Sequence, residues 1–252
     1  MNKLLLQSPR AVPLRQAGFS LVELMIAIVI AMVVTAGAIA VFGNMRSTFT
    51  TQDKLGQLQD NQRLALSILN TTVQSAGYYP DPTTHDVATV FAAAASANSD
   101  GTLFAAEGVI IGTGALTATS DVLNVRFSGS TRDGVMNCQG VPFTQAASAV
   151  PLTVAVSTFE VISNQLTCRV DGGTAVALID NVSSMKVSYL VAKSATTYAY
   201  MDAPSVTAGS YWPSVIGTRI TLQFIDPLKT GNQALPYTNT QIINLMNKSS
   251  ST

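Results

Sequence analysis

The sequence has little of the chemistry that enzymes and metalloproteins need. Its 252 residues include one histidine, two cysteines and one tryptophan, and only 11% of them are charged. Zinc sites that combine several histidine and cysteine ligands are therefore strongly disfavoured. The formal net charge of zero argues against a strongly basic nucleic-acid binder. No phosphate-binding loop, nucleophile elbow or dinucleotide fingerprint occurs, so we expect no enzyme, no cofactor and no metal site.

Apolar residues, by contrast, make up 47% of the chain. Residues 24–43 carry no charge, and Thr35 is their only hydrogen-bonding side chain. As a helix this run would be about 30 Å long, which is enough to cross the hydrocarbon core of a bilayer. Residues 1–18 hold three basic residues and no acidic one. The positive-inside rule therefore predicts a single membrane span, with a cytoplasmic N-terminus and an exported C-terminal part.

A glutamate stands at the cytoplasmic edge of this run. Glu23 is costly in lipid, by a few kcal/mol on insertion scales, so its presence indicates a function. It belongs to residues 16–27, which read QAGFSLVELMIA. This segment resembles the class III signal of type IV prepilins and pseudopilins, in which a basic leader ending in glycine precedes a phenylalanine, a glutamate at the fifth mature position and a continuous apolar helix.

The resemblance implies roles for three residues. Prepilin peptidase would cleave on the cytoplasmic side after Gly18 and methylate the new amino terminus at Phe19, so the mature protein would keep its apolar helix. A glycine before the scissile bond leaves the backbone open to close approach by a protease. Glu23 would pair with the methylated amine of a neighbouring subunit and set the axial register of the helix in a filament, because an unpaired buried charge costs about 3 to 5 kcal/mol. The alternative is a carboxylate that extends to the membrane surface without a partner.

Residues 44–77 continue the helix with an amphipathic pattern, because apolar residues recur there at intervals of three and four. Gly77 is a suitable cap and Pro80 cannot extend a helix, so we expect the helix to end near Ala76. A helix from Phe19 to that point would be about 87 Å long.

The remaining residues, 78–252, alternate short apolar runs with turn residues, which predicts a mainly antiparallel sheet against the amphipathic half-helix. The expected strands are 108–111, 122–127, 159–162, 166–170, 175–179, 184–191 and 218–225. Ser163-Asn164 is expected to form a hairpin turn, and 92–101 and 195–210 are expected to be surface loops. The class is α+β with a pilin-like fold. We expect four parts: leader 1–18, membrane or filament-core half-helix 19–43, amphipathic half-helix 44–77, and exported β-rich domain 78–252.

Part of the β-rich region resembles PilW-type minor pilins. In those proteins an apolar pair and an Asn-Val step lead into a strand that ends in tyrosine, and a tryptophan precedes a later strand that contains valine and arginine. The matching residues here are 178–182 (LIDNV), Met185, Val187, Tyr189, Trp212, Val215, Arg219, Ile220 and Leu222. Pseudopilin J of type II secretion shares similar features.

Both cysteines, Cys138 and Cys168, lie in the part predicted to be exported, where oxidising conditions favour pairing. Closing a loop of about 30 residues would stabilise the fold by about 3 to 4 kcal/mol. The alternative is two buried free thiols. His85 follows Asp81 in the segment DPTTH, which we interpret as a turn after the helix rather than an acid–base pair.

Together the resemblances imply a minor pilin, a structural subunit that helps to initiate type IV pilus assembly in a tip or priming complex and thereby supports motility, adhesion or DNA uptake. The implied partners are prepilin peptidase, other minor pilins, the major pilin and the inner-membrane assembly platform. The protein would be anchored in the inner membrane, with its C-terminal domain in the periplasm, and would then enter the pilus at the cell surface. Beyond residue 77, eight basic residues face eleven acidic ones, which argues against direct nucleic-acid binding.

Two other functions stay open from the sequence. One is a J-like pseudopilin of type II secretion. The other is a secreted binding protein cleaved after Ala40, because residues 38–40 form a small-x-small pattern that follows an apolar stretch.

Overall fold

The computed structural model describes residues 18, 20–93, 102–114, 118–228 and 236–247 of the chain. By its internal contacts the chain divides into two compact units, Met1–Gln52 and Asp53–Thr252. The first unit contains the start of the long helix α1 (Leu21–Gln74), and the second contains its end and both β-sheets. The α+β class predicted from the sequence is confirmed.

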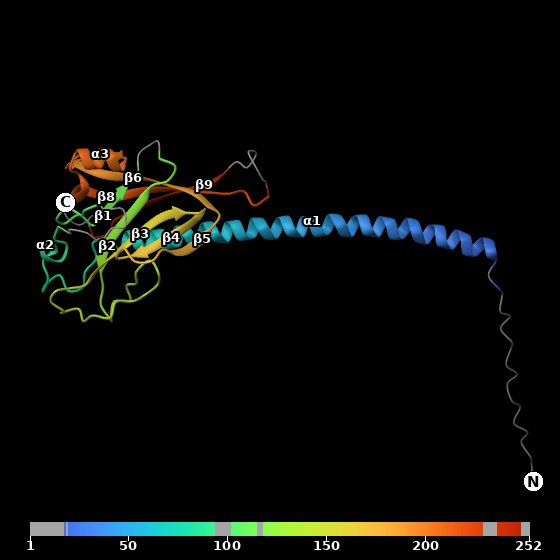
Figure 1. Ribbon diagram of the computed structural model, residues 1–252, viewed down its shortest axis with the longest axis horizontal. Coiled ribbons are helices and arrows are strands. Elements are labelled where there is room, and N and C mark those ends of the chain that lie inside the picture. The colour runs from blue at the N-terminus through green and yellow to red at the C-terminus, as the bar shows by residue number, and fades with distance from the viewer. Residues whose placement is uncertain (1–17, 19, 94–101, 115–117, 229–235, 248–252) are drawn as a thin grey trace, which may run out of the picture. The chain divides into compact units, whose positions relative to one another are not determined.

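Helix α1 is continuous (Figure 1) and about 81 Å long at 1.5 Å per residue. Its α-helical hydrogen bonds end at Gln74, and a turn follows over residues 75–77. Gly77 has a φ of 73°, a left-handed conformation that suits glycine, and its N–H donates to the carbonyl of Arg126. The helix therefore ends within two residues of the predicted position.

The second unit buries one stripe of α1. The buried positions are Leu58, Ala65, Leu69, Thr72 and Val73. Most of these are separated by three, four or seven residues, so they share one face of the helix. All of them except Thr72 belong to a single hydrophobic cluster that also contains residues of both sheets. The predicted packing of the amphipathic half-helix against antiparallel sheet structure is thus confirmed.

Five strands form the first sheet, which is an antiparallel meander in the order β1-β2-β3-β4-β5 (Figure 1). The strands are β1 (Ile110–Thr113), β2 (Val122–Ser128), β3 (Val154–Ile162), β4 (Gln165–Val170) and β5 (Val176–Asp180). The β3–β4 hairpin turns at Ser163 and Asn164, as the sequence predicted, and both residues have positive φ. Two left-handed central residues are what a tight hairpin of matching twist requires.

A second sheet of four strands follows in the order β7-β6-β8-β9. Its strands are β6 (Val182–Ser194), β7 (Thr197–Met201), β8 (Val215–Phe224) and β9 (Tyr237–Asn244). The predicted antiparallel strands are thus divided between two sheets: the chain leaves the first sheet at Asn181, which has a φ of 62°, and starts the second at Val182. Strand β9 was not predicted, because its polar residues lack the apolar alternation by which most of the strands were recognised.

The prediction that 195–210 is a surface loop is wrong as well. Strand β7 extends the second sheet, and the short helix α3 (Ala203–Ala208) follows it. The Asp202 side chain caps α3 by accepting from the N–H of Ser205 at 3.2 Å. Small and polar residues concealed these elements, because β7 is stabilised by pairing with β6 and α3 by contact with β6 and β1, and neither shows a clear apolar period. Of the other expected loop, 92–101, only residues 92 and 93 are described, and they follow the short helix α2 (Val87–Val90).

Most of the residues that resemble PilW-type proteins lie in the core of this unit, whereas Asp180 and Asn181 are exposed and Arg219 is partly exposed. Tyr189 on β6 is fully buried, and its ring meets that of Trp212 edge-to-face with 4.8 Å between centroids. Trp212 begins the single-turn helix η1 (Trp212–Ser214), directly before β8. Gly112 on β1 allows this packing, because a Cβ there would lie 1.9 Å from the Tyr189 hydroxyl oxygen. The Tyr189–Trp212 pair thus connects β6 with η1 in the core, and Gly112 lets β1 approach it closely.

Candidate functional site

The predicted cleavage site directly precedes α1. Gly18 is exposed, and a Cβ built on it would meet no atom within 4 Å, so its backbone is sterically open. Phe19 lies outside the described residues. The carbonyl of Ser20 accepts from the N–H of Leu24 at 3.2 Å, which places the start of the helix immediately after the cleavage site.

Glu23 lies in the first turn of α1 and is exposed. A carboxylate in that position is favoured by the helix dipole. Within the described part of the chain, no ion pair or side-chain hydrogen bond engages it. A carboxylate inside an apolar environment needs an opposite charge, and the described residues supply none to Glu23.

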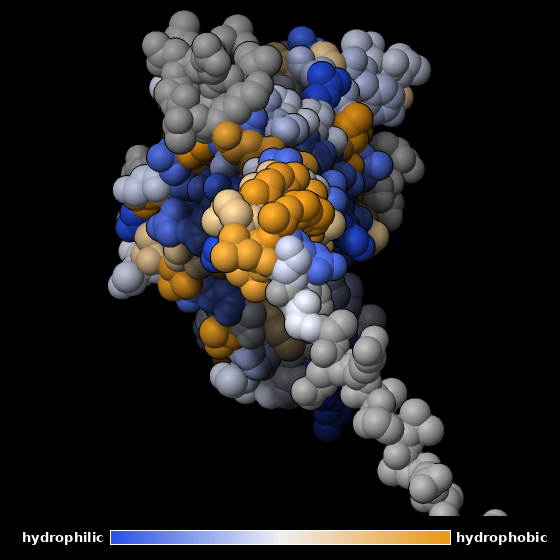
Figure 2. All heavy atoms as spheres, turned by 90° about the vertical axis from the view of Figure 1, so that its right-hand side faces the viewer, coloured by the Kyte–Doolittle hydropathy of each residue, from blue (hydrophilic) through white to orange (hydrophobic). Residues whose placement is uncertain are grey.

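Every described residue from Ser20 to Thr50 is exposed, including the entire apolar run. Figure 2 looks toward the start of α1, and hydrophobic side chains gather there. The exposed large side chains include Leu21, Val22, Leu24, Met25, Ile26, Ile28, Val29, Ile30, Met32, Val33, Val34, Ile39, Val41 and Phe42. By length and composition α1 can cross a membrane, and it is the one described helix that can. Its surface is suited to lipid or to other apolar helices and not to water.

A disulfide joins Cys138 to Cys168. Cys168 lies on β4, and Cys138 lies in the long connection between β2 and β3, residues 129–153, which we call the excursion. The disulfide therefore attaches the excursion to the first sheet. The Gln139 amide strengthens this link by donating to the carbonyl of Cys168 at 3.3 Å. Gln145 closes the base of the same excursion, because its amide donates to the carbonyls of Gly129 and Thr153. The excursion is therefore held at several points.

Arg126 is a structural core residue that the sequence did not reveal. It is buried on β2, and its guanidinium donates to the carbonyls of Phe91, Ala92, Ala105 and Gly108. The rings of Phe91 and Phe104 lie 5.4 and 4.6 Å from its central carbon. Burial lowers the pKa of Arg126 to about 10, so the side chain stays protonated at neutral pH. A charged residue between Val125 and Phe127 in a largely apolar strand was the available signal.

The turn after α1 has the geometry that the sequence predicted. Hydroxyls of Thr83 and Thr84 donate to the Asp81 carboxylate and lower its pKa. His85 Nε2 lies 3.0 Å from the carbonyl oxygen of Ala147, and its backbone N–H donates to the carbonyl of Asp81. His85 thus takes part in a turn and in a loop contact. Among the residues that the structure describes, no group of three or more His, Cys, Asp or Glu side chains is placed to hold a metal ion.

Tyr78 and Asp133 connect the same region to the excursion between β2 and β3. The Tyr78 hydroxyl donates to Asp133 Oδ2 at 3.3 Å, and the same oxygen accepts from the N–H of Ser130. Burial and, to a smaller extent, the Asp133 charge raise the pKa of Tyr78. Tyr79 meets Phe91 edge-to-face at 5.9 Å, so packing accounts for this tyrosine.

Comparison with known proteins identifies the N-terminal segment. A family model described as the prokaryotic N-terminal methylation motif matches residues 13–39. The match includes Gly18, Phe19, Glu23 and much of the apolar run. No curated protein matches the chain.

A motif of this type implies processing by prepilin peptidase and assembly with other pilins. Together with the single apolar helix at the start of α1, it fits a protein anchored in the inner membrane. The chain therefore carries a type IV prepilin-like methylation motif, which supports its place in the prepilin and pseudopilin family.

Proposed function

We propose that this protein is a PilW-type minor pilin, a structural and non-catalytic subunit that helps to initiate type IV pilus assembly in a tip or priming complex. The observation that carries the proposal is the direct connection of a methylation motif to an apolar helix whose side chains are exposed. Removing one large apolar side chain from water is worth about 1.5 to 3 kcal/mol, so such a helix needs lipid or a bundle of other helices.

The two environments correspond to two stages. Before assembly, the apolar half of α1 anchors the protein in the inner membrane, with residues 1–18 in the cytoplasm and the β-rich unit in the periplasm. After cleavage behind Gly18, the same surface moves from lipid into a helical bundle formed with the major pilin and other minor pilins. The assembly platform drives this transfer, and the surface pilus then supports motility, adhesion or DNA uptake.

Glu23 sets the register in this proposal. Its carboxylate pairs with the methylated amine of Phe19 on a neighbouring subunit, because a charge among apolar helices is stable only beside an opposite charge. The pair forms at one axial offset between helices and disfavours the others.

Support for the PilW type comes from the β-rich unit. The residues that resemble that subfamily occupy β5, β6, η1 and β8, where the Tyr189–Trp212 contact joins strand to single-turn helix. The resemblance therefore covers neighbouring elements, and most of its matching residues are buried. The J-like pseudopilin shares these features, and the experiments below separate the two.

Processing is the first test. The full chain is produced with and without a prepilin peptidase, and the mature N-terminus is determined by mass spectrometry. We expect a chain that begins with N-methylated Phe19, and a Gly18→Leu variant that stays uncleaved because its side chain obstructs the protease. Gly37→Ala is the matched control, since Gly37 also has open space around it and lies outside the cleavage site. A mature chain that starts at Val41 would overturn the proposal in favour of a secreted binding protein.

Assembly is the second test. Glu23→Gln is compared with Asp53→Asn, which removes an exposed carboxylate from the second unit's part of the same helix. We expect both variants to be processed and only Glu23→Gln to disappear from sheared pili. Normal incorporation of Glu23→Gln would contradict the register role. Deletion of the gene should abolish surface pili, and loss of enzyme export with intact pili would identify a type II secretion pseudopilin instead.

A further inference from the structure

The outer face of the four-stranded sheet carries an unusual group of side chains. We call Leu190, Tyr198, Tyr200, Arg219 and Ile242 the tyrosine–arginine face. Tyr198, Tyr200 and Ile242 are 50%, 37% and 56% exposed. Strands β6 and β8 alternate buried positions with partly exposed ones, so this surface is the side of the sheet that faces away from the core. Large apolar and aromatic side chains grouped on such a surface indicate an interaction site.

Strand register places these residues on one face. Leu190 pairs with Tyr200 on β7, and two residues earlier Ser188 pairs with Arg219 on β8. Arg219 in turn pairs with Ile242 on β9. Directly paired residues share a face, as do residues two apart on one strand. Tyr189 lies between Ser188 and Leu190 and points the other way, into the core.

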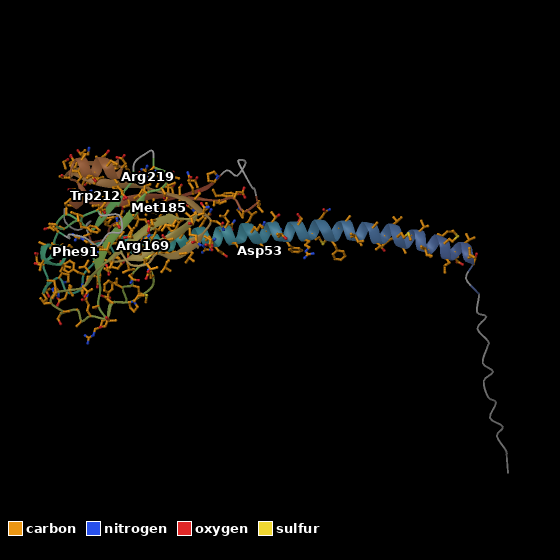
Figure 3. All side chains as sticks on the ribbon, in the orientation of Figure 1. Asp53, Phe91, Arg169, Met185, Trp212 and Arg219 are labelled. Carbon is orange, nitrogen blue, oxygen red and sulfur yellow. A yellow bond between two sulfur atoms is a disulfide. The ribbon has the colours of Figure 1, made fainter. Side chains whose placement is uncertain are left out.

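Arg219 is held in place by an aromatic ring. Its central guanidinium carbon lies 3.9 Å from the centroid of the Tyr200 ring, which is a stacking distance. Figure 3 labels Arg219 on the second sheet. In the described part of the chain, no hydrogen bond or ion pair engages its side chain. The guanidinium therefore keeps its N–H donors available while its position is restricted.

This arrangement fits a carboxylate. A guanidinium presents paired donors that match the two oxygens of a carboxylate, and stacking on Tyr200 reduces the entropy lost on binding. The paired residues that share this face include Ser188, Thr221 and Thr240 and no acidic residue. Exposed tyrosine, arginine and isoleucine together also have the composition of an energetically important protein contact.

A nucleic acid fits this face less well. Single-stranded nucleic acid needs several cations along its backbone in addition to stacking rings. The other cation near the middle of this face, Lys186, is already paired with Asp121 at 3.1 Å. One available guanidinium between apolar side chains matches a single carboxylate in an apolar setting.

We propose that the tyrosine–arginine face docks a protein partner that presents an aspartate or glutamate to Arg219, with apolar side chains around it that cover Tyr198 and Ile242. The inference concerns a surface of the β-rich unit and does not depend on the filament role of α1. It assigns a binding face and the chemistry of its partner.

Photo-crosslinking in the native host tests the proposal with the full chain. A benzophenone amino acid replaces Tyr198 and, as a matched control, Tyr237, which is 40% exposed and lies on β9 at the opposite strand parity to Ile242. We expect a protein adduct from position 198 whose crosslinked region contains an aspartate or glutamate. Arg219→Gln should reduce its yield about tenfold, as expected for loss of a charge-assisted hydrogen bond, and Arg219→Lys should reduce it less.

Charge exchange gives the decisive result. Arg219→Glu should abolish the adduct, and replacing the partner's identified acid by arginine should restore it. Ile242→Asp serves as a second variant at an exposed site where folding is undisturbed, and it should weaken the adduct as Arg219→Gln does. The proposal is overturned by an adduct on nucleic acid or lipid, by a yield that is independent of Arg219, by failure of the exchange, or by no adduct above that from position 237.

Discussion

The two units of this protein differ in whether they bury their apolar residues. In Asp53–Thr252, helix and sheets bury a common cluster within the same chain. In Met1–Gln52, the described residues of α1 leave almost every side chain exposed. The difference shows that one continuous helix can combine two kinds of surface, because its second half packs against its own sheets and the exposed apolar surface of its first half is suited to lipid or to other apolar helices.

Their isolated charges show the same contrast. Arg126 is buried in the β-rich unit, and its own chain supplies four carbonyl acceptors. Glu23 lies beside an apolar run, and no described residue of its own chain pairs with it. The first charge therefore stabilises the fold of its own unit, whereas the second has no described partner in its own chain and is the one to which the proposed function gives a role in assembly.

Loss of the disulfide should have the largest effect on the β-rich unit. The bond closes a loop with a sequence separation of 30. Replacing Cys138 and Cys168 by serine should lower the free energy of unfolding by about 3 to 4 kcal/mol. Denaturant titration of the full chain in detergent, followed by the fluorescence of the single tryptophan Trp212, measures this unit. We expect the helicity of α1 before Gln52 to be unaffected by these substitutions. If it were lost together with the structure of the β-rich unit, the two units would not be stabilised separately.

Removal of the Arg126 side chain should come next. Arg126→Met leaves buried carbonyls such as those of Ala92 and Gly108 without this donor, which should cost about 2 to 3 kcal/mol. Arg126→Lys should cost less because it keeps a charge and some donors. Arg132→Met, at an exposed position, is the control and should be neutral. Equal stability of the two methionine variants in the same titration would contradict the role of Arg126.

Glycine-to-alanine substitutions compare the units directly. At Gly112 a Cβ would lie 1.9 Å from the Tyr189 hydroxyl and 2.7 Å from the carbonyl oxygen of Val122, so Gly112→Ala should destabilise by about 1 to 3 kcal/mol. At Gly43 no atom lies within 4 Å, so Gly43→Ala should stabilise the helix by up to about 1 kcal/mol. Tryptophan fluorescence follows thermal unfolding of the unit that contains Trp212, and circular dichroism follows the loss of helix in α1. A change in stability of the same sign for Gly112→Ala and Gly43→Ala would contradict the difference between the two units.

The smallest effect is a pH dependence confined to the second unit. The pKa of Tyr78 is raised above its ordinary value of 10.0, first by burial and then by Asp133. The folded state therefore holds this proton more tightly than the unfolded state. Its contribution to stability is complete below pH 10 and is lost as the pH rises through the folded pKa. The melting temperature of the parent protein should fall when the pH is raised from about 9 to above 10, and Tyr78→Phe should make this fall smaller. The same fall in the variant as in the parent would count against the contact between Tyr78 and Asp133.

Local patterns predicted some elements well and others poorly. The apolar period, Gly77 and Pro80 located the end of α1 to within two residues, because these signals act within one turn of helix. The Ser163-Asn164 hairpin was found for the same reason. Strand β9 and the change of sheet at Asn181 were missed, since their stability depends on partners distant in the sequence.

The candidate site divides in the same way. The cleavage motif and Glu23 could be recognised because a peptidase reads a contiguous segment, and the family match covers that segment. Arg126 and the tyrosine–arginine face could not, since Phe91, Ala105 and Gly108 approach Arg126 only in the folded chain. Arg219 was noticed in the sequence only as a family feature, without its stacking partner Tyr200.

The sequence by itself determined that this protein has a methylation motif, a membrane-length helix and a β-rich part with two cysteines, because each of these depends on composition or on neighbouring residues. Only the tertiary structure decided three features: the β-rich part contains two sheets, the helix shares one hydrophobic core with both of them, and Arg219 stacks on Tyr200 at an open surface. These features depend on register between strands far apart in the chain, where a shift of one residue would exchange the buried and exposed faces.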